Sequence, residues 1–512
     1  MRAIGVLNTS SRSQLAFGVI VVGLLVLSVC AALPIDPQGP FDARDHSRLA
    51  GMRLEPAGWS SLIEPWAAPF HILAGAPDFR VAVVVVLIWL VLGVAAWRLV
   101  SDSRRQTVKS LWLCALRAVG TGVAAGLVLV MWLACAVMIR LPGWRLVVDD
   151  ERTLIADLQS HTFSSHDGLA SEAENLAWHT AAGINVVALT EHAHVATTTG
   201  ADEAGRAASA PPPAVILGTE LRSARNGSHL LGLGLQPDYQ CPTSSVEGAF
   251  PSRYATYVHE QHRGAVIAMA YELRLEDVIP FADAGIDAFE IANFGHPRIP
   301  SDVRNRLLEV TRERGLALLA SSDWHGWGGI SRTWTVIRTP EGVPTSPDKV
   351  AALVVKKLRD HDAADIIPVV AGYLGSPSPL RGIFSPVIEP LRYAAELSLA
   401  QVISWWVWSA LAIALVQVLS RFGFAPAKSF LALLLTLVGS GLLWAGLRLI
   451  LATVNGLTTS GFPREIGTYI SLLGGAALLA AVWLGISVWR ARRADHHAPR
   501  RPQAPPRVEL SA

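Results

Sequence analysis

Histidines and carboxylates recur at the polar ends of short apolar runs in the middle of this chain. The first group, DLQSHTFSSHDG over residues 157–168, places His161 and Asp167 in one loop after a β-prone run. Later groups follow in the order TEHAH with His192, GTE with Glu220, SHLLG with His229, and SDWH with Asp323 and His325. Imidazole and carboxylate together favour Zn, Mn or Fe. The ends of successive strands in a barrel are where such ligands collect.

The elements that must position these residues alternate between strand and helix signals. Short buried strands are predicted at 153–158, 184–189, 215–218, 229–235, 265–270, 288–292 and 316–320. Helices are predicted between several of them, at 171–182, 251–262, 275–284 and 301–314, with a closing helix at 346–361. This alternation predicts an α/β barrel or a doubly wound sheet.

The motifs, taken in order, resemble the polymerase and histidinol phosphatase (PHP) superfamily over roughly residues 150–372. The resemblance implies a distorted (β/α)7 TIM-like barrel that carries one to three divalent transition metal ions and hydrolyses phosphate esters. Carried over by position, the implied metal ligands are His161, Asp167, His192, Glu220, His229, Asp323 and His325. Four of these, Asp167, His192, Asp323 and His325, are the implied catalytic positions.

Two positions depart from the family pattern. Gln159 stands where the first histidine of an HxH motif is expected, and Tyr271 stands where an AHP-like motif has its ligand. The analogy implies that the cation held by Asp167, His192 and His325 keeps all its ligands, while the other two cations lose one each. Candidates for holding a substrate phosphate are the arginines of the rim segments, because a guanidinium binds phosphate bidentately: Arg222, Arg225, Arg274 and Arg298.

The composition is too apolar for a wholly soluble protein, with 51% hydrophobic residues and a mean hydropathy of +0.37 in 512 residues. About 20 apolar residues cross a bilayer core. Six spans are therefore predicted, at 15–33, 81–97, 118–139, 397–420, 429–447 and 466–489. The predicted parts are a membrane region of three helices at 1–149, the PHP-like domain at 150–372, a second three-helix membrane region at 373–489, and a basic disordered tail at 490–512.

Positive charges predict the orientation of the chain. Arg104, Arg105 and Lys109 lie between the second and third spans, and the tail after Trp489 is strongly basic. The positive-inside rule makes these segments cytoplasmic. The chain is then a multi-pass protein of the cell (inner) membrane with its PHP-like domain outside the cytoplasm.

The predicted domain is acidic, with 28 acidic and 18 basic residues between positions 150 and 372. A surface of that charge argues against nucleic acid as a partner. The expected partners are the lipid bilayer and a small-molecule or lipid-linked phosphate ester. Histidines outside the motifs, including His179 and His259, are expected on solvated helix faces, and Asp157 is expected to be structural.

Two functions follow from this pattern. The first is a membrane-anchored metal-dependent phosphatase or phosphodiesterase that acts outside the cytoplasm through a metal-activated water. The alternative is a degenerate, non-catalytic PHP-like sensor that binds a metal or ligand, and it is motivated by Gln159 and Tyr271. A transporter is disfavoured because the predicted spans hold almost no ionisable residues at mid-membrane; Arg448 lies near an end of its span.

Overall fold

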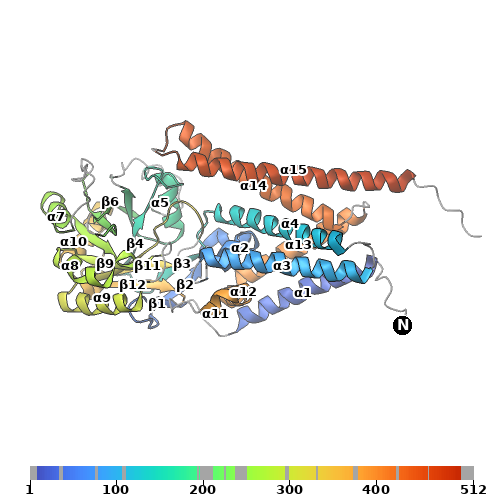
Figure 1. Cartoon of the computed structure of the whole chain (residues 1–512). Coiled ribbons are helices and arrows are strands. Elements are labelled where there is room, and N and C mark those ends of the chain that lie inside the picture. The colour runs from blue at the N-terminus through green and yellow to red at the C-terminus, as the bar shows by residue number, and fades with distance from the viewer. Residues whose placement is uncertain are drawn as a thin grey trace, which may run out of the picture.

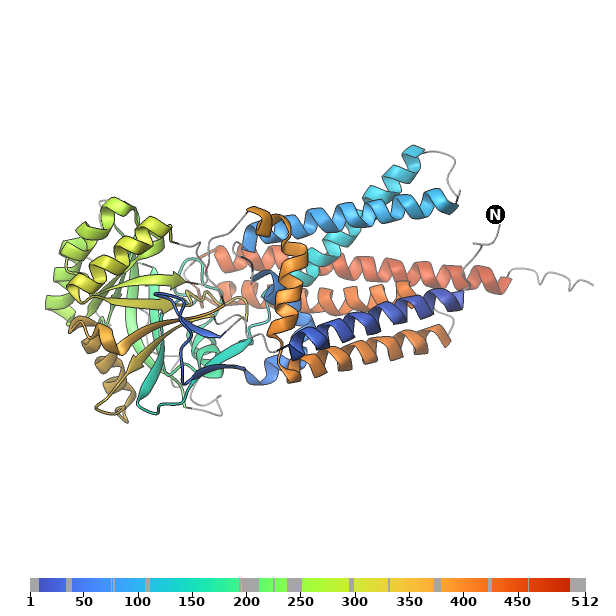
Figure 2. The same ribbon diagram turned by 90° about the horizontal axis from the view of Figure 1, so that it is seen from below.

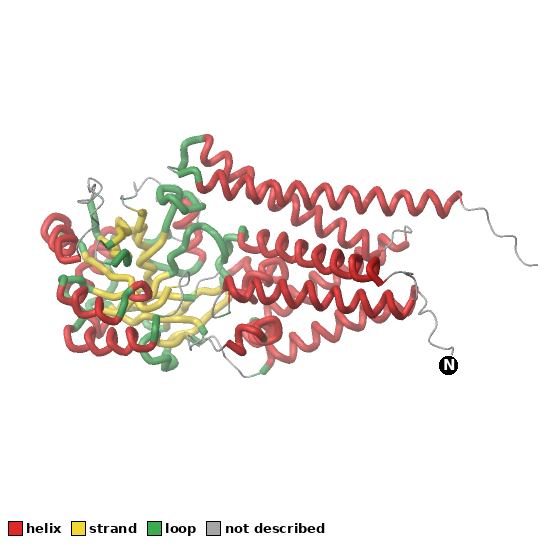
Figure 3. The backbone as a smooth tube through the Cα atoms, viewed as in Figure 1, coloured by secondary structure: helices red, strands yellow, loops and turns green. Residues whose placement is uncertain are grey.

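The computed structural model describes residues 9–33, 39–74, 76, 79–105, 111–192, 195, 211–223, 226–236, 251–293, 299–329, 332–372, 379–421, 426–458 and 460–497. Strands gather at one end of the molecule and long helices at the other (Figure 3). The chain begins with a long helix, which is followed by two short strands and then by further helices. Most of the strand-rich part comes next, and the chain continues into a second group of helices (Figure 1).

The long helices form where apolar spans were predicted. They are α1 (Thr9–Ala32), α3 (Phe79–Arg105), α4 (Leu111–Val137), α13 (Leu399–Arg421), α14 (Pro426–Val454) and α15 (Phe462–His497). Within the described residues, five helices are long and apolar enough to cross a membrane, and α1 contributes the shorter apolar segment Phe17–Ala32. The length and composition of these helices indicate a membrane protein. α15 continues to His497, so the first part of the predicted tail is helical; residues 498–512 lie outside the described residues.

Glycines bring α14 and α15 into close contact. A Cβ atom on Gly446 would lie 2.5 Å from the carbonyl oxygen of Gly467, and one on Gly474 would lie 2.7 Å from that of Gly439. Helices without a hydrophobic driving force between them associate through such small residues, because the backbones can then approach closely. The α14–α15 pair is therefore a tightly packed hairpin.

The strand-rich part contains all seven predicted strands. They are β4 (Thr153–Ser160), β5 (Val186–His192), β6 (Ala214–Arg222), β7 (His229–Leu233), β8 (Ala265–Met269), β9 (Ala288–Asn293) and β10 (Ala317–Ser321), adjacent in chain order within one sheet. β4, β5 and β6 are parallel, as are β8, β9 and β10, whereas β7 is antiparallel to both neighbours. The sheet is thus a parallel arc with one reversed strand.

The sheet curls until β10 approaches β11 (Thr333–Arg338) and β4. Thr335 Oγ1 donates a hydrogen bond to the Ala320 carbonyl at 2.9 Å, and Thr333 Oγ1 donates to that of Ser321 at 2.7 Å. Side chains from each strand of the arc, such as Leu158 and Leu319, form one buried cluster together with Val354 of α10 (Pro347–Arg359). The result is a TIM-like curled sheet whose interior is filled by side chains.

Helices cover the outside of the arc at the positions expected from the sequence. They are α5 (Glu172–Ala181), α7 (Pro251–Tyr257), α8 (Val278–Asp283) and α9 (Ser301–Arg314). A capping box begins α5: the Ser171 side chain accepts from the Glu174 N–H, and the Glu174 side chain accepts from that of Ser171. This cap fixes where α5 starts after the loop that carries His161 and Asp167.

Segments outside the predicted limits of the domain extend its sheet. β1 (Pro40–Asp42) lies before residue 150 and pairs with β12 (Ile366–Ala371), which lies within the predicted domain and pairs with β11. β2 (Met52–Pro56) pairs with β3 (Trp144–Val148) in a separate two-stranded sheet that packs on the core. The chain before residue 150 is therefore more than a membrane region, since part of it belongs to the strand-rich part.

Short helices connect the two parts. α2 (Glu64–Ala74) and α12 (Ser385–Glu396) lie between the strands and the long helices (Figure 2). The buried Glu64 carboxylate accepts hydrogen bonds from Tyr393 at 2.8 Å and from Gln401 at 2.9 Å, and it pairs with His71 at 2.9 Å. This buried polar network ties α2 and α12 to the start of α13.

Candidate metal centre

The ligands proposed from the motifs meet at one rim of the curled sheet. His161 directly follows β4, His192 ends β5, Glu220 lies near the end of β6, and Asp323 and His325 follow β10. His229 opens β7 instead of ending it. Because β7 runs in the opposite direction, its first residue lies at the same rim as the last residues of the parallel strands.

One group of side chains centres on His161. Its Nε2 atom lies 3.1 Å from Glu220 Oε2 and 3.0 Å from Asp323 Oδ1. All three side chains are almost completely buried. An imidazole nitrogen that faces two buried carboxylates is a donor set for a divalent cation of the Zn, Mn or Fe type.

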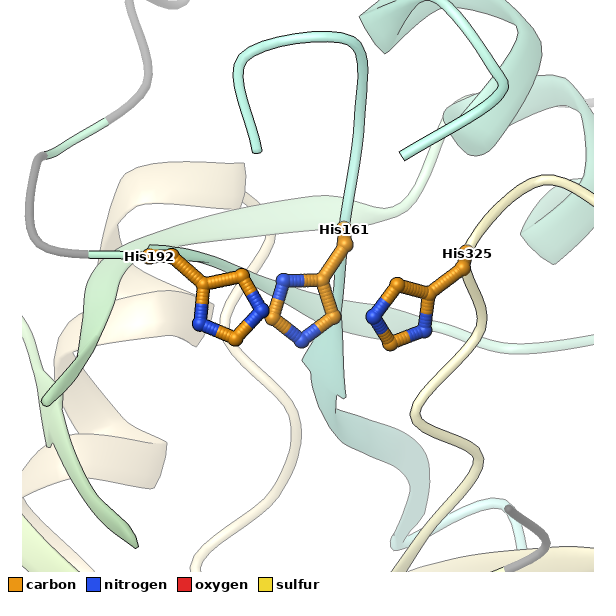
Figure 4. A group of neighbouring side chains, drawn as sticks. All are labelled: His161, His192 and His325. Atoms are coloured by element: carbon orange, nitrogen blue, oxygen red, sulfur yellow. The ribbon is translucent and has the colours of Figure 1, made fainter. Parts of the chain in front are cut away.

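A second group centres on Asp167. One of its oxygens, Oδ1, lies 3.4 Å from His192 Nε2, and the other, Oδ2, lies 3.4 Å from His325 Nε2. The His161 ring stacks between the other two, with centroids 4.7 Å from that of His192 and 4.2 Å from that of His325 (Figure 4). The three imidazoles therefore join the two groups into one centre.

The far nitrogen of several rings is held by a hydrogen bond, so that Nε2 faces inward. His161 Nδ1 lies 3.0 Å from Ser165 Oγ, His325 Nδ1 lies 2.7 Å from the Asp323 carbonyl oxygen, and His229 Nδ1 lies 2.9 Å from Glu272 Oε1. Metal-binding histidines characteristically use the second ring nitrogen in this way, which fixes both ring orientation and tautomer. The residues present therefore fit a divalent metal.

Charges in the centre shift one another's protonation. Burial disfavours the charged form of His161, but hydrogen bonds to Asp323 and Glu220 outweigh it and raise the pKa of the imidazole well above its usual 6.5. Burial likewise opposes the charge of Asp167, yet His192 and His325 hold the pKa of that carboxyl far below its ordinary value. The raised pKa of His161 and the lowered pKa of Asp167 therefore share one cause, the pairing of imidazoles with carboxylates in the centre.

Gln159 lies inside the centre but presents hydrogen-bond donors. Its Nε2 donates to Glu220 Oε2 and to Asp323 Oδ1, both at 2.9 Å. Its Oε1 accepts from Asn293 at 3.2 Å, and Asn293 also donates to the buried Glu290. In this arrangement the Gln159 oxygen accepts from Asn293, and its amide hydrogens face the two carboxylates that would hold a cation.

Tyr271 is not brought into the ligand set. Its hydroxyl donates to Met269 Sδ at 3.0 Å. Burial, with the charge of Glu290 next in effect, raises the pKa of the phenol well above 10, so the oxygen stays protonated. His229 is nearby but peripheral: its Nε2 lies 3.6 Å from Glu220 Oε1. A third cation would have only His229 and Glu220 from the predicted set.

Sequence reasoning missed the residue that holds the loop at 161–167. Glu191, which directly precedes His192, is fully buried. It accepts from the Thr162 hydroxyl at 2.7 Å, from the Thr162 N–H at 3.2 Å and from Ser165 Oγ at 2.5 Å. The signal was the acidic residue inside TEH, but only the fold shows that it faces the neighbouring loop.

A second support lies beneath Asp323. Asp157 is fully buried and accepts from the Ser322 N–H at 3.0 Å and from the Ser322 hydroxyl. Asp323 itself has a φ of 54°, a left-handed conformation that is uncommon for an aspartate and marks functional sites. Asp157 is thus structural as predicted, and it helps to hold the turn that aims Asp323 at His161.

The prediction for His179 was wrong. Its side chain is fully buried, with Nε2 3.0 Å from Asp157 Oδ2 and Nδ1 2.8 Å from the Asn175 carbonyl oxygen. The amphipathic pattern of α5 placed His179 on a solvated face, whereas the ring packs inward against Trp178 and Trp324. His179 therefore extends the support of Asp157 into α5.

The arginine candidates receive little support from the geometry. Arg274 is largely exposed, and its Nη1 lies 4.0 Å from Glu276 Oε1. Arg222 is exposed at the end of β6. Arg225 and Arg298 lie outside the described residues. His166, beside Asp167, is a closer neighbour of the centre, because its ring centroid lies 4.5 Å from that of His192.

Comparison with known proteins gives structural neighbours only. No protein-family model and no curated protein matches the chain. A protein from Bifidobacterium adolescentis described as a metal-dependent phosphoesterase is 18% identical and covers 34% of this chain and 88% of its own, with a TM-score of 0.27. A two-domain protein from Bacteroides vulgatus that contains a PHP-like metal-dependent phosphoesterase is 16% identical and covers 45% and 69%, with a TM-score of 0.32. An amidohydrolase from Chromobacterium violaceum, with bound sulfate and no metal, is 16% identical and covers 33% and 87%, with a TM-score of 0.26.

Proposed function

We propose that the chain is a membrane-anchored, metal-dependent phosphoesterase whose catalytic part lies outside the cytoplasm. The observation that carries this proposal is the joined pair of donor groups, His161–Glu220–Asp323 and Asp167–His192–His325. Divalent cations bound there would supply Lewis acidity to the phosphate and lower the pKa of a water to about 7.

The residues of the centre divide the remaining tasks between them. The imidazoles of His161, His192 and His325 would offer nitrogen donors to a cation. The carboxylates of Glu220 and Asp167 provide negative charge that balances cations and repels a phosphate when cations are absent. Binding of an anionic ester therefore requires a loaded centre, which couples substrate affinity to metal occupancy.

The test uses the full chain purified in detergent without chelator. We expect at least one equivalent of Mn, Zn or Fe by elemental analysis, and hydrolysis of p-nitrophenyl phosphate or of bis(p-nitrophenyl) phosphate. Chelation should abolish the activity and added metal should restore it. His192→Ala should lose both metal and activity, whereas His259→Gln should retain both, because His259 pairs with Asp287 away from the centre. A chain that stays metal-free after reconstitution would refute the proposal.

A non-catalytic sensor is the second candidate, and Gln159 favours it. The Gln159 amide donates to Glu220 and Asp323, two of the side chains that would hold a cation. The double variant Gln159→His with Tyr271→His restores the family pattern. A sensor should gain metal and some activity from it, while an enzyme adapted to Gln159 should keep or lose its rate. A wild-type chain that is metal-loaded yet inert on monoesters, diesters and lipid phosphates would favour the sensor.

A further inference from the structure

The side chains of the centre differ in exposure, and the difference shows where the centre opens. The His161 side chain is 0% exposed, and Glu220 and Asp323 are almost as deeply buried. Asp167 is 32% exposed and His166 is 70% exposed. Both exposed residues belong to the segment 161–170, here called the ligand loop. The centre is therefore most accessible from the side of this loop.

The ligand loop rests directly on the α14–α15 hairpin. Ser460, in the turn between the two helices, donates a hydrogen bond from its hydroxyl to the His166 carbonyl oxygen at 2.5 Å. Phe163 and Leu169 of the loop are buried in one apolar cluster with residues of both helices, among them Leu449 of α14 and Ile470 of α15. The accessible side of the centre thus lies against a membrane hairpin.

Ion pairs hold the same region to two membrane helices. Glu174, which belongs to the capping box of α5, pairs with Arg448 of α14. It also pairs with Arg140, which follows α4, and the distance from Arg140 Nη1 to Glu174 Oε2 is 2.9 Å. Arg140 also donates to the Leu169 carbonyl oxygen of the ligand loop at 2.6 Å. The loop is therefore fixed relative to the membrane helices and is not merely close to them.

The second ligand-bearing loop also sits on the end of a spanning helix. The N–H of Gly328, shortly after His325, donates to the carbonyl oxygen of Val137 at 2.6 Å. Val137 is the last residue of the apolar span in α4. The apolar span of α14 ends at Val454, and that of α15 begins at Phe462. The loops that carry Asp167 and His325 therefore lie at the level where these helices leave the apolar layer, which is the level of lipid headgroups.

We infer that the substrate is a lipid-linked phosphate ester, whose phosphate reaches the centre from the membrane surface beside the α14–α15 turn. The inference rests on the proposed phosphoesterase function and adds the source of the substrate. A phosphate on a lipid is already confined to the headgroup layer. Its effective concentration at a site fixed in that layer exceeds that of a soluble ester by a factor on the order of 100 or more.

The test compares substrates that share a headgroup and differ only in their chains. The full chain is reconstituted with Mn²⁺ in lipid nanodiscs. Dioleoyl phosphatidate is compared with glycerol 3-phosphate, and dioleoyl phosphatidylglycerol with glycerophosphoglycerol. We expect kcat/KM to be at least about 100-fold greater for one long-chain ester than for its soluble partner. The rate should also follow the mole fraction of that lipid at constant bulk concentration.

Each other outcome overturns the inference in a distinguishable way. If kcat/KM for a long-chain ester and its soluble partner were equal within about threefold, the centre would take its substrate from solution. That result would refute the lipid source and leave the phosphoesterase function supported. A metal-loaded chain that hydrolyses neither member of either pair, nor the nitrophenyl esters, would remove the proposed function and the inference together. His259→Gln serves as the matched variant in both arms, since His259 lies away from the ligand loop.

Discussion

Glu191→Gln should weaken metal binding by about 10- to 100-fold while leaving the barrel folded. Glu191 is fully buried and accepts three hydrogen bonds, two from Thr162 and one from Ser165. Glutamine has nearly the same shape, so the substitution removes charge and one acceptor without opening a cavity. The effect therefore isolates the hydrogen bonds that hold the ligand loop.

The size of the effect follows from counting donors. With the amide oxygen in place of Oε1, the Thr162 N–H would face an NH2 group and lose its acceptor. With the amide turned over, the Thr162 hydroxyl would receive a hydrogen bond, and its own proton would lose its acceptor. At least one buried donor is unsatisfied in either case, because the Ser165 hydroxyl also faces the NH2 group in the first orientation. Each unsatisfied donor costs about 1–3 kcal/mol. The cost falls on the loop conformation that presents His161 and Asp167.

Titration calorimetry of the chelated full chain with Mn²⁺ measures the effect directly. Glu309→Gln is the matched control, because Glu309 is exposed and pairs with Arg306 on α9, so the variant chain should bind metal as the wild type does. Thermal unfolding without metal checks that the variant is folded. A Glu191→Gln chain with wild-type Mn²⁺ affinity would show that the loop needs no support from Glu191, and the reasoning would be wrong.

Three further outcomes are expected. The raised pKa of His161 contributes stability to the metal-free chain below the unfolded value of about 6.5, and this contribution is lost as pH rises through the folded pKa. The increase in Tm on adding Mn²⁺ should therefore grow with pH above about 6.5, and an increase that shrinks would contradict this. Arg448→Met should remove one partner of Glu174 and weaken Mn²⁺ binding severalfold, because a half-exposed ion pair contributes about 1 kcal/mol. Unchanged Mn²⁺ affinity would show that the ligand loop does not depend on this pair. Compartment-specific reporters fused at Gly200 and after Ala512 should be active outside and inside the cytoplasm respectively, and cytoplasmic activity at Gly200 would refute the orientation.

The membrane helices affect the centre more than their composition indicates. In the sequence, Arg448 lies near an end of its predicted span. In the structure it pairs with Glu174, next to the loop that carries Asp167. The α14–α15 hairpin therefore helps to hold the ligand loop, which couples the centre to the packing of α14 against α15.

The sequence alone determined the elements and the candidate ligands. Seven apolar runs became strands and six apolar stretches became long helices, because hydrophobic length and periodicity are local properties of a chain. The resemblance of the motifs to the PHP pattern also named the candidate ligands His161, Asp167, His192, Glu220, Asp323 and His325. The fold brings them together because residues that end parallel strands share one rim. Each of these predictions required only the order of residues along the chain.

The tertiary structure alone decided which groups face one another. Glu191, Asp157 and His179 act on loops that are distant in sequence, and no local pattern distinguishes a buried carboxylate from an exposed one. The same holds for three further features: the antiparallel direction of β7, the orientation of the Gln159 amide, and the contact of the ligand loop with the α14–α15 hairpin. Hydrogen bonds and ion pairs depend on distances of about 3 Å, and the fold sets those distances only after remote segments have packed.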